Sequence, residues 1–408
     1  MRVLMLSWEY PPHVVGGLGR HVTNLAPALV AEGIEVHVLT PLLRHGEPHE
    51  VTPAGVHVHR VPAPHMEDYS FLSFARETNA ALERVARELQ HQVGEFTLIH
   101  AHDWLVADAA IALKHAWRRP LISTIHALER GRQQGYLGGE HSEQINNIEW
   151  QLTYEAWRVI ACSRFMAAQL HEYFATPTDK LDIVPNGVHV RPSPFLDDAE
   201  RLAFRRSLAA DDEQLVFYVG RMVFEKGVHV LIDAWPRVLE RMPRARLVIA
   251  GTGGYLEALK QQVWDRGVGD QVTFTGFISD EDRDRLYHAA DLAVFPSLYE
   301  PFGIVALEAM AACCPVVVSE TGGLMEVVAN HETGLTVKPN DPESLAWGIL
   351  HTLEHPDWAR ARAENALREV RESYSWERVA VLTADVYRRT YAAWREDPWG
   401  AALAPRPD

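Results

Sequence analysis

The chain has 408 residues, and a single hydrophobic core stops growing at about 250 to 300 residues, so two domains are expected. A formal charge of -16 argues against nucleic-acid binding, which needs a basic surface, and no stretch approaches the roughly 20 apolar residues that span a bilayer. The three cysteines form an adjacent pair and a distant single, which gives neither a disulfide framework nor zinc-ligand spacing, so the predicted location is a reducing cytoplasm.

Short apolar runs alternate with helical patterns along the chain, and this alternation predicts parallel sheets with helices on both faces. In the first half, helices are predicted at 21–32 and 74–91. The predicted strands there are 3–7, 36–40, 56–61, 98–101, 121–124 and 159–161, with a last strand and turn at 183–188. An Arg-Pro-Ser-Pro segment at 191–194 follows, so the first domain is predicted to cover 1–190.

The same alternation restarts and predicts a second doubly wound domain over 191–375. Its predicted strands are 215–219, 245–250, 272–275, 292–296, 315–318 and 334–337. A helical pattern follows at 376–396, and 397–408 is predicted to be a loose tail. Ligands of such sheets bind beyond the carboxyl ends of the strands, so the loops that follow strands are the candidate sites.

A glycine loop, Gly16-Gly17-Leu18-Gly19, follows the first strand and precedes a helix predicted to begin near Arg20 or His21. Glycines allow close approach of the backbone, and a helix N-terminus offers unpaired amides, so the loop is either a phosphate site or a tight turn. A nicotinamide-dependent dehydrogenase is disfavoured, because G-x-G-x-x-G is absent and the second strand closes on Leu39-Thr40-Pro41 without an acidic residue.

Two cations, Arg221 and Lys226, follow the first strand of the second domain. Cations beyond a strand end can neutralise a diphosphate leaving group, although exposed Arg and Lys side chains more often form surface salt bridges.

The segment 295–310 carries two carboxylates around a Pro-Phe-Gly turn. Glu300 lies in the loop, and Glu308 lies about one turn into a helix predicted to begin near Ile304. Carboxylates accept hydrogen bonds from paired sugar hydroxyls, so one could hold the transferred sugar and the other a ribose. The alternatives are a charge favoured by the helix dipole for Glu300 and a solvated helix position for Glu308.

A further glycine loop, Thr321-Gly322-Gly323, follows the next strand and gives a second candidate anion site on the same edge of the sheet.

Together these motifs resemble those of the GT-B glycosyltransferases of family 4, and also those of the glycogen and starch synthases of family 5. They occur in family order over nearly the whole chain. The motifs that carry the resemblance are Gly16 to Val22, His100-Ala101-His102-Asp103-Trp104, Thr124-Ile125-His126, Val184-Pro185-Asn186-Gly187-Val188, Gly220-Arg221, Glu225-Lys226-Gly227, Glu300 to Glu308 and Thr321-Gly322-Gly323.

The resemblance implies two Rossmann-like domains, with the helix at 376–396 crossing back to the first, and a nucleotide diphosphate sugar as donor. It assigns the diphosphate to Arg221 and Lys226, the donor sugar to Glu300 and the ribose to Glu308. Further donor-binding residues implied are Gly16, Gly17, Phe277, Ile278, Phe302, Gly303, Ile304, Thr321, Gly322 and Gly323, with Phe277 and Ile278 framing the nucleobase.

The resemblance places His126 beside the transferred sugar. On the acceptor side, it assigns Trp104, Glu129 and Asn186 to a carbohydrate acceptor. The implied reaction retains the anomeric configuration and needs no enzyme nucleophile. His126, Arg221, Lys226 and Glu300 are then the predicted catalytic residues.

No metal or cofactor is predicted. The only acidic run that resembles a cation site, Asp280-Glu281-Asp282, follows Ser279 at a predicted helix start, where capping and the helix dipole account for it.

The motifs are most similar to short glycogen synthase-like members, which implies ADP-glucose as donor and an α-glucan or small sugar as acceptor. Two departures favour family 4 over family 5, because Val14 and Arg20 stand where starch-type synthases carry a lysine and an aspartate. UDP-glucose or GDP-mannose as donor, or a nucleotide-sugar epimerase on the same scaffold, remain alternatives.

Overall fold

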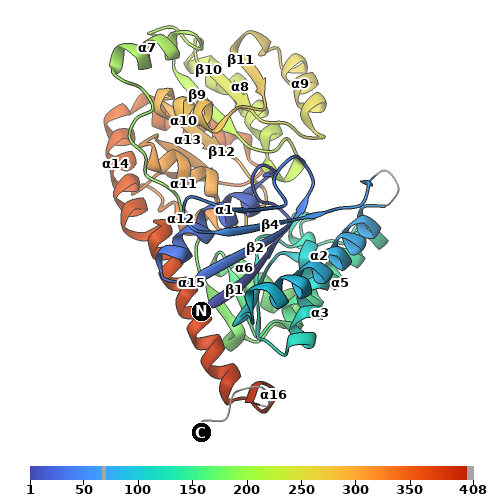
Figure 1. Ribbon diagram of the computed structural model, residues 1–408. Coiled ribbons are helices and arrows are strands. Elements are labelled where there is room, and N and C mark those ends of the chain that lie inside the picture. The colour runs from blue at the N-terminus through green and yellow to red at the C-terminus, as the bar shows by residue number, and fades with distance from the viewer. Residues whose placement is uncertain (67–69, 402–408) are drawn as a thin grey trace. The chain divides into compact units, whose positions relative to one another are not determined.

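The computed structural model describes residues 1–66 and 70–401, which fall into two compact units (Figure 1). Unit 1 comprises Met1–Gly187 with the C-terminal segment from Trp376, and unit 2 comprises Val188–Ser375. Each unit has its own mostly parallel sheet with helices packed against it, which is the doubly wound α/β class predicted from the sequence.

The sheet of unit 1 has eight strands in the order β3-β4-β2-β1-β5-β6-β7-β8, and only β3 is antiparallel. Its strands are β1 (Arg2–Ser7), β2 (Glu35–Leu42), β3 (His49–Val51), β4 (His57–Pro62), β5 (Leu98–His102), β6 (Leu121–Ile125), β7 (Arg158–Ala161) and β8 (Leu181–Ile183). Its helices are α1 (Gly17–Ala31), α2 (Phe71–Val93), η2 (Trp104–Val106), α3 (Ala107–Trp117), α4 (Glu129–Arg132), α5 (Glu140–Glu155), α6 (Arg164–Phe174), η3 (Thr178–Lys180), α15 (Trp376–Glu396) and α16 (Pro398–Ala401).

The sheet of unit 2 has six strands, all parallel, in the order β11-β10-β9-β12-β13-β14. Its strands are β9 (Leu215–Val219), β10 (Arg246–Ala250), β11 (Val272–Gly276), β12 (Leu292–Phe295), β13 (Val316–Ser319) and β14 (Leu335–Val337). Its helices are α7 (Asp198–Arg206), η4 (Phe224–Lys226), α8 (Val228–Arg241), α9 (Leu256–Asp265), η5 (Gly269–Gln271), α10 (Asp280–Ala289), α11 (Ile304–Ala311), α12 (Leu324–Val327), α13 (Pro342–Glu354) and α14 (Pro356–Ser373).

The C-terminal helix α15 belongs to unit 1, as the resemblance predicts. Its apolar face, including Trp376, Val379 and Tyr387, packs against α1 and the underlying strands in one buried cluster. Tyr387 also donates or accepts a hydrogen bond of 2.6 Å with Nδ1 of His100 on β5, so the helix is fixed to the sheet by a polar contact as well.

Several predicted boundaries are wrong, including the start of α2 at Phe71 and the end of β2 at Leu42. Helix α1 begins at Gly17 instead of Arg20 or His21, because Gly16 is its N-cap and the glycines form its first turn. The last strand of unit 1 ends at Ile183, where it was predicted to begin, since Pro185 has no N–H for a sheet and restricts the residue before it. The predicted loose tail is helical at Pro398–Ala401, and residues 402–408 lie outside the described residues.

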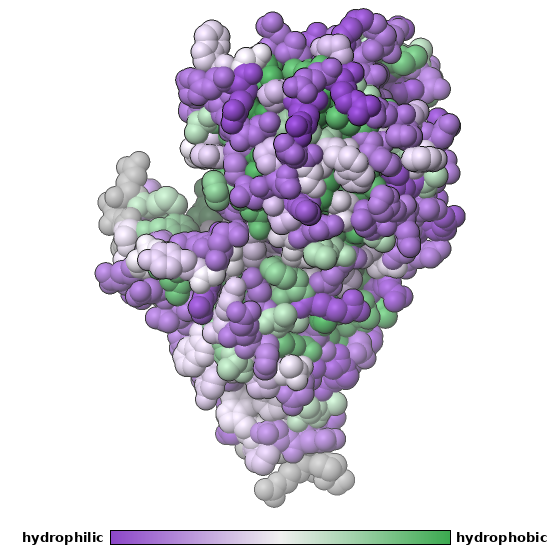
Figure 2. Space-filling model, turned by 180° about the vertical axis from the view of Figure 1, so that it is seen from behind, coloured by the Kyte–Doolittle hydropathy of each residue, from purple (hydrophilic) through white to green (hydrophobic). Residues whose placement is uncertain are grey.

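Hydrophilic side chains predominate on the face of the molecule shown in Figure 2. Among the helices of the described residues, none is both long enough and apolar enough to cross a membrane.

Candidate active site

In unit 2, candidate residues gather where the strand order reverses. β9 and β12 are neighbours in the sheet, and their connections leave in opposite directions, which opens a crevice at their carboxyl ends. Lys226 follows β9 and Glu300 follows β12, and Lys226 Nζ lies 2.6 Å from Glu300 Oε2. The Ser297 hydroxyl lies 3.3 Å from the same oxygen. Both side chains of the ion pair are mostly buried, so the structure places these two predicted residues together.

Backbone contacts hold the two loops of this pair in register. The carbonyl of Glu225 accepts N–H bonds from Leu298 at 2.8 Å and Tyr299 at 3.2 Å. Gly227 adopts a left-handed conformation at φ +67, and a Cβ atom there would lie 1.9 Å from the Pro296 carbonyl oxygen. The glycine that follows Lys226 is therefore required by the close approach of the neighbouring loop.

The glycine loop after β13 packs against the Glu300 loop. Its own hydrogen bonds reduce the number of backbone amides that remain free to bind an anion. Gly323 N–H donates to the Glu300 carbonyl at 2.8 Å, and Thr321 N–H donates to the Ser319 carbonyl at 2.8 Å. Of these three loop amides, only that of Gly322 has no acceptor among the described residues, and its φ is +53. The predicted anion site at 321–323 therefore offers one free backbone amide from this loop.

Arg221 and Glu308 lie in different surroundings from the Lys226–Glu300 pair. The Arg221 side chain is half exposed, and its Nη2 lies 3.6 Å from Glu225 Oε1. Glu308, on α11, is not a solvated helix residue: its Oε2 lies 3.2 Å from Arg283 Nε and 3.5 Å from the Tyr287 hydroxyl, and the side chain is largely buried. The alternative interpretation of Glu308 as a solvated helix residue is therefore wrong, because its carboxylate is buried and paired.

Some of the remaining predicted donor residues are exposed, and others are buried or shape the backbone. Phe277 follows β11, the edge strand, and its ring is 82% exposed, with Ile278 half-buried beside it. Phe302 is buried and packs edge-on against Tyr374 at 6.1 Å between centroids. Gly303, at φ +107, is the N-cap that allows α11 to begin at Ile304. The structure does not bring Phe277 next to Phe302.

In unit 1, the corresponding reversal of strand order lies between β1 and β5. The glycine loop follows β1, but a carboxylate of the protein itself already occupies it: Glu9 Oε2 accepts the N–H groups of Val15 at 2.8 Å and Gly16 at 3.0 Å. A side chain on Gly19 would collide with Glu9, which explains that glycine. The backbone amides of Val15 and Gly16 are therefore already satisfied by a carboxylate of the same chain.

Three histidines meet at this edge of the sheet. His102 Nδ1 lies 3.1 Å from His126 Nε2, and the rings of His21 and His126 are 4.8 Å apart. His21 Nδ1 lies 2.6 Å from Asn186 Oδ1, so the structure joins two of the predicted residues, His126 and Asn186, through His21. Burial lowers the pKa of His21 to about 4 and holds the pKa of His126 well below its ordinary value. These imidazoles are neutral at pH 7 and act as hydrogen-bonding groups.

Asp103 supports this group and was quoted in the sequence motif without a role. Its Oδ1 accepts the backbone N–H of His126 at 2.7 Å, and its own backbone has φ +60, which is uncommon for a residue other than glycine. Burial raises the pKa of Asp103 to about 7, against hydrogen bonds that lower it. Its place in that motif, directly after a buried strand, was the sequence signal for this position.

Asp103→Asn is expected to change how stability depends on pH. The folded carboxyl has a pKa of about 7, above its unfolded value, so the folded state binds this proton more tightly. In the wild type, stability therefore falls as pH rises through the interval between the unfolded pKa of about 4 and about 7, and then levels off with respect to this group.

Urea unfolding at about pH 5, 6, 7 and 8 tests this expectation. The stability of the variant relative to the wild type should increase up to about pH 7, because asparagine keeps the acceptor oxygen without the buried charge. A difference between the two proteins that is constant with pH would contradict it.

The other predicted acceptor residues are held by hydrogen bonds or packing. The Trp104 ring is buried and packs edge-on against Phe71 at 6.0 Å, so its faces are not open for stacking. Glu129 Oε1 accepts hydrogen bonds from Gln133 Nε2 at 2.5 Å and Ser142 Oγ at 3.0 Å. Glu149, which the sequence analysis did not single out, accepts the Glu129 N–H at 2.9 Å, and burial raises its pKa well above the ordinary value.

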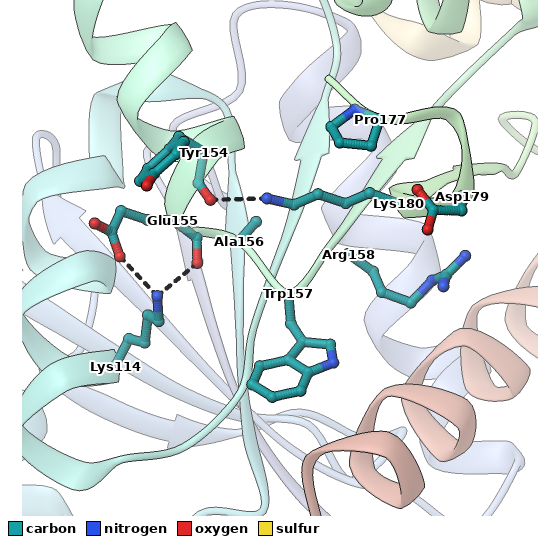
Figure 3. Close-up of a pocket in the computed structure, with 9 residues that line it drawn as sticks. All are labelled: Lys114, Tyr154, Glu155, Ala156, Trp157, Arg158, Pro177, Asp179 and Lys180. Atoms are coloured by element: carbon teal, nitrogen blue, oxygen red, sulfur yellow. Dashed lines mark hydrogen bonds and ion pairs between the residues drawn. The ribbon is translucent and has the colours of Figure 1, made fainter. Parts of the chain in front are cut away.

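A cavity of about 440 Å³ lies at the amino ends of the unit 1 strands, where β7 begins (Figure 3). Its cations are already engaged: Lys114 Nζ lies 2.6 Å from Glu155 Oε2, and Lys180 Nζ donates to the Tyr154 carbonyl at 2.7 Å. None of the predicted site residues lines it, and it lies at the amino ends of the strands, away from the candidate groups.

Comparisons with known proteins cover both halves of the chain. Residues 200–369 match the family described as Glycosyl transferases group 1, and residues 15–191 match Glycosyltransferase Family 4. An uncharacterized glycosyltransferase of Methanocaldococcus jannaschii is 39% identical over 95% of this chain and 98% of its own length. A glycogen synthase of Mycobacterium tuberculosis is 38% identical over 95% of this chain and 94% of its own length. The structure of a sucrose-phosphate synthase from Thermosynechococcus elongatus has a TM-score of 0.83 and 28% identity, covering 96% of this chain and 99% of that one.

Proposed function

Because this chain belongs to the GT-B glycosyltransferases of group 1 and family 4, we propose that it transfers glucose from ADP-glucose to an α-glucan acceptor with retention of configuration. The observation that carries the proposal is the Lys226–Glu300 pair at the switch point of the unit 2 sheet, 2.6 Å apart. The choice of glucose and an α-glucan is supported by the likeness to a glycogen synthase that is 38% identical.

Sugar transfer requires that the diphosphate leaving group be stabilised. When the bond between the anomeric carbon and the phosphate oxygen breaks, negative charge develops on the diphosphate, and a positioned cation lowers that barrier. Lys226 supplies such a charge from a fixed loop, and the half-exposed Arg221 can add a second by reorienting from Glu225. The Gly322 amide supplies a further donor.

Glu300 fits the donor sugar because its carboxylate is buried and oriented by two neighbours. Its carboxylate lies within reach of both the Lys226 ammonium and the Ser297 hydroxyl. On binding, sugar hydroxyls would share this carboxylate while Lys226 turns to the diphosphate. Glu308, held by Arg283 in the adjoining helix, is proposed to accept from the ribose.

We assign the neutral His126 to the transferred sugar. A neutral imidazole can donate or accept a hydrogen bond to a sugar hydroxyl without placing a positive charge beside an oxocarbenium-like centre. The acceptor hydroxyl attacks from the face that the diphosphate leaves, and its proton passes to the departing phosphate oxygen. No protein nucleophile is required.

The reaction is proposed to be independent of metal ions, because Lys226 and Arg221 are proposed to neutralise the diphosphate. Two carboxylates of the acidic run at the start of α10 have other partners: Asp282 Oδ2 accepts a hydrogen bond from Ser279 Oγ at 2.7 Å, and Asp280 pairs with Arg283. The expected result is full transferase activity in a chelator, measured as sugar transfer to glycogen, maltose and glucose 1-phosphate. A loss that manganese restores would refute metal independence.

The same assay run with ADP-glucose and UDP-glucose chooses the donor. Chain growth or a new glucosyl product from ADP-glucose is the expected result. Turnover of the nucleotide sugar in the absence of any acceptor would instead favour the epimerase alternative. Inactivity with every glucose donor, together with binding of another nucleotide sugar such as GDP-mannose, would retain the enzyme class and overturn the donor.

A further inference from the structure

A second group of histidines lies on strands β2, β4 and β3, at one side of the unit 1 sheet. It plays no part in the proposed reaction. We call it the edge-histidine cluster, and its members come from three adjacent strands. They are Glu35 and His37 on β2, His57 and His59 on β4, and His49 on β3.

The strand register brings these side chains onto one face. Glu35 and His37 are two residues apart on β2, as are His57 and His59 on β4, so each pair points to the same side. His37 lies directly opposite His57, and His49 lies directly opposite His59. The intervening residues Val36, Val38, Val56 and Val58 point to the other face, into the core beneath α1 and α15.

His37 is the centre of the cluster. It is buried against the Phe96 ring, and its two ring nitrogens both have polar partners. Nε2 lies 3.1 Å from Glu35 Oε1, and Nδ1 lies 3.1 Å from His59 Nε2. The His57 ring stacks on the His37 ring at 4.5 Å between centroids, and the outer His49 ring stacks on His59 at 4.7 Å.

These atoms match the donor set of a transition metal. One ligand atom from each of Glu35, His37 and His57 lies within 4.8 Å of the others. Two ligands of a tetrahedral zinc ion, each at about 2.0–2.1 Å from the metal, are about 3.3 Å apart, close to the observed separation of His37 Nε2 and Glu35 Oε1. Imidazole with a single carboxylate suits Zn²⁺ and its neighbours, whereas Mg²⁺ and Ca²⁺ prefer oxygen ligands alone.

We propose that Glu35, His37 and His57 bind a divalent transition-metal ion, with Zn²⁺ as the best match. His59 would orient His37 by accepting the N–H of its Nδ1, the outer-shell arrangement that fixes a ligating imidazole. Arg2 Nε lies 2.7 Å from Glu35 Oε1, so it holds the carboxylate in place but also competes for that oxygen. The His57 ring, which stacks on the His37 ring, must turn about χ2 to point at the same ion, a torsion that is soft in histidine.

The consequence of binding would be structural. The ligands join β2 to β4 near the edge of the sheet, and an ion held there stabilises the folded state, since the unfolded chain does not assemble the site. The site lies apart from His21, His102 and His126, whose ring nitrogens also lie within 4.8 Å of one another, so an experiment must separate the two groups.

The test is zinc titration of the chelator-stripped full chain by calorimetry, with cobalt absorption as a second readout of coordination. The variant is His57→Gln, at a half-buried position, and the matched controls are His126→Gln in the other histidine group and His91→Gln at an exposed site on α2. We expect one saturable site per chain, weakened at least tenfold in His57→Gln and unchanged in both controls.

Retained binding in a folded His57→Gln, or loss of binding in His126→Gln, would overturn the proposal. An independent measurement on the wild type covers the case in which the variant fails to fold. Anomalous diffraction from zinc-soaked crystals should place the ion between Glu35, His37 and His57. Zinc absent from that position, or present only at scattered surface sites, would refute the assignment.

Discussion

Lys226→Ala is expected to lower kcat/KM for sugar transfer by about 10²- to 10³-fold, mainly through kcat. The ammonium would act on charge that develops as the diphosphate leaves, so its contribution is larger in the transition state than in the bound donor. The loss of stability should be about 1–2 kcal/mol, because Glu300 keeps the Ser297 hydroxyl as a partner after the ion pair is lost.

Two further variants separate the catalytic effect of losing Lys226 from the effect of leaving the Glu300 carboxylate without its ion-pair partner. Lys260→Ala removes an exposed lysine of the same unit that pairs with Glu257 at 2.8 Å, and it should leave activity unchanged. Lys226→Ala combined with Glu300→Gln removes the unpaired charge and should recover stability without recovering activity. Full activity in Lys226→Ala would remove this lysine from the mechanism.

Gly227→Ala is expected to impair both stability and transfer, although the glycine carries no functional group. The left-handed conformation at φ +67 alone costs about 1–2 kcal/mol for alanine. The added Cβ would also lie 1.9 Å from the Pro296 carbonyl, so the loop after β9 and the loop after β12 must move apart. That movement separates Lys226 from Glu300, and we expect activity to fall at least tenfold, since small misplacements of catalytic groups are costly.

The matched control is Gly254→Ala, at a glycine of the same unit that has open space around its Cα. It should change the urea midpoint and kcat/KM little. Wild-type activity in a folded Gly227→Ala would show that the approach of the two loops is not needed for transfer.

Much of the fold could be predicted from the sequence because parallel strands buried on both faces are continuous apolar runs. β9 was predicted with its observed bounds, Leu215–Val219, and most other strands were predicted within one residue of theirs. β3 was missed because its three residues, His49–Val51, carry no apolar pattern and pair only at the edge of the sheet. α1 was begun too late because glycine is a poor helix former, and its first turn is fixed by Glu9 instead.

For the candidate site, the sequence by itself determined the loops that carry chemistry and their polar residues, since each loop follows an apolar strand and ends at a helix. Only the tertiary structure decided how these residues pair. It joined Lys226 to Glu300 and Glu308 to Arg283, and it linked His126 to Asn186 through His21. It also buried Trp104 and assembled the edge-histidine cluster from three strands. The physical reason is that local composition specifies a strand or a turn, whereas distances between loops depend on strand order and register, which no single segment encodes.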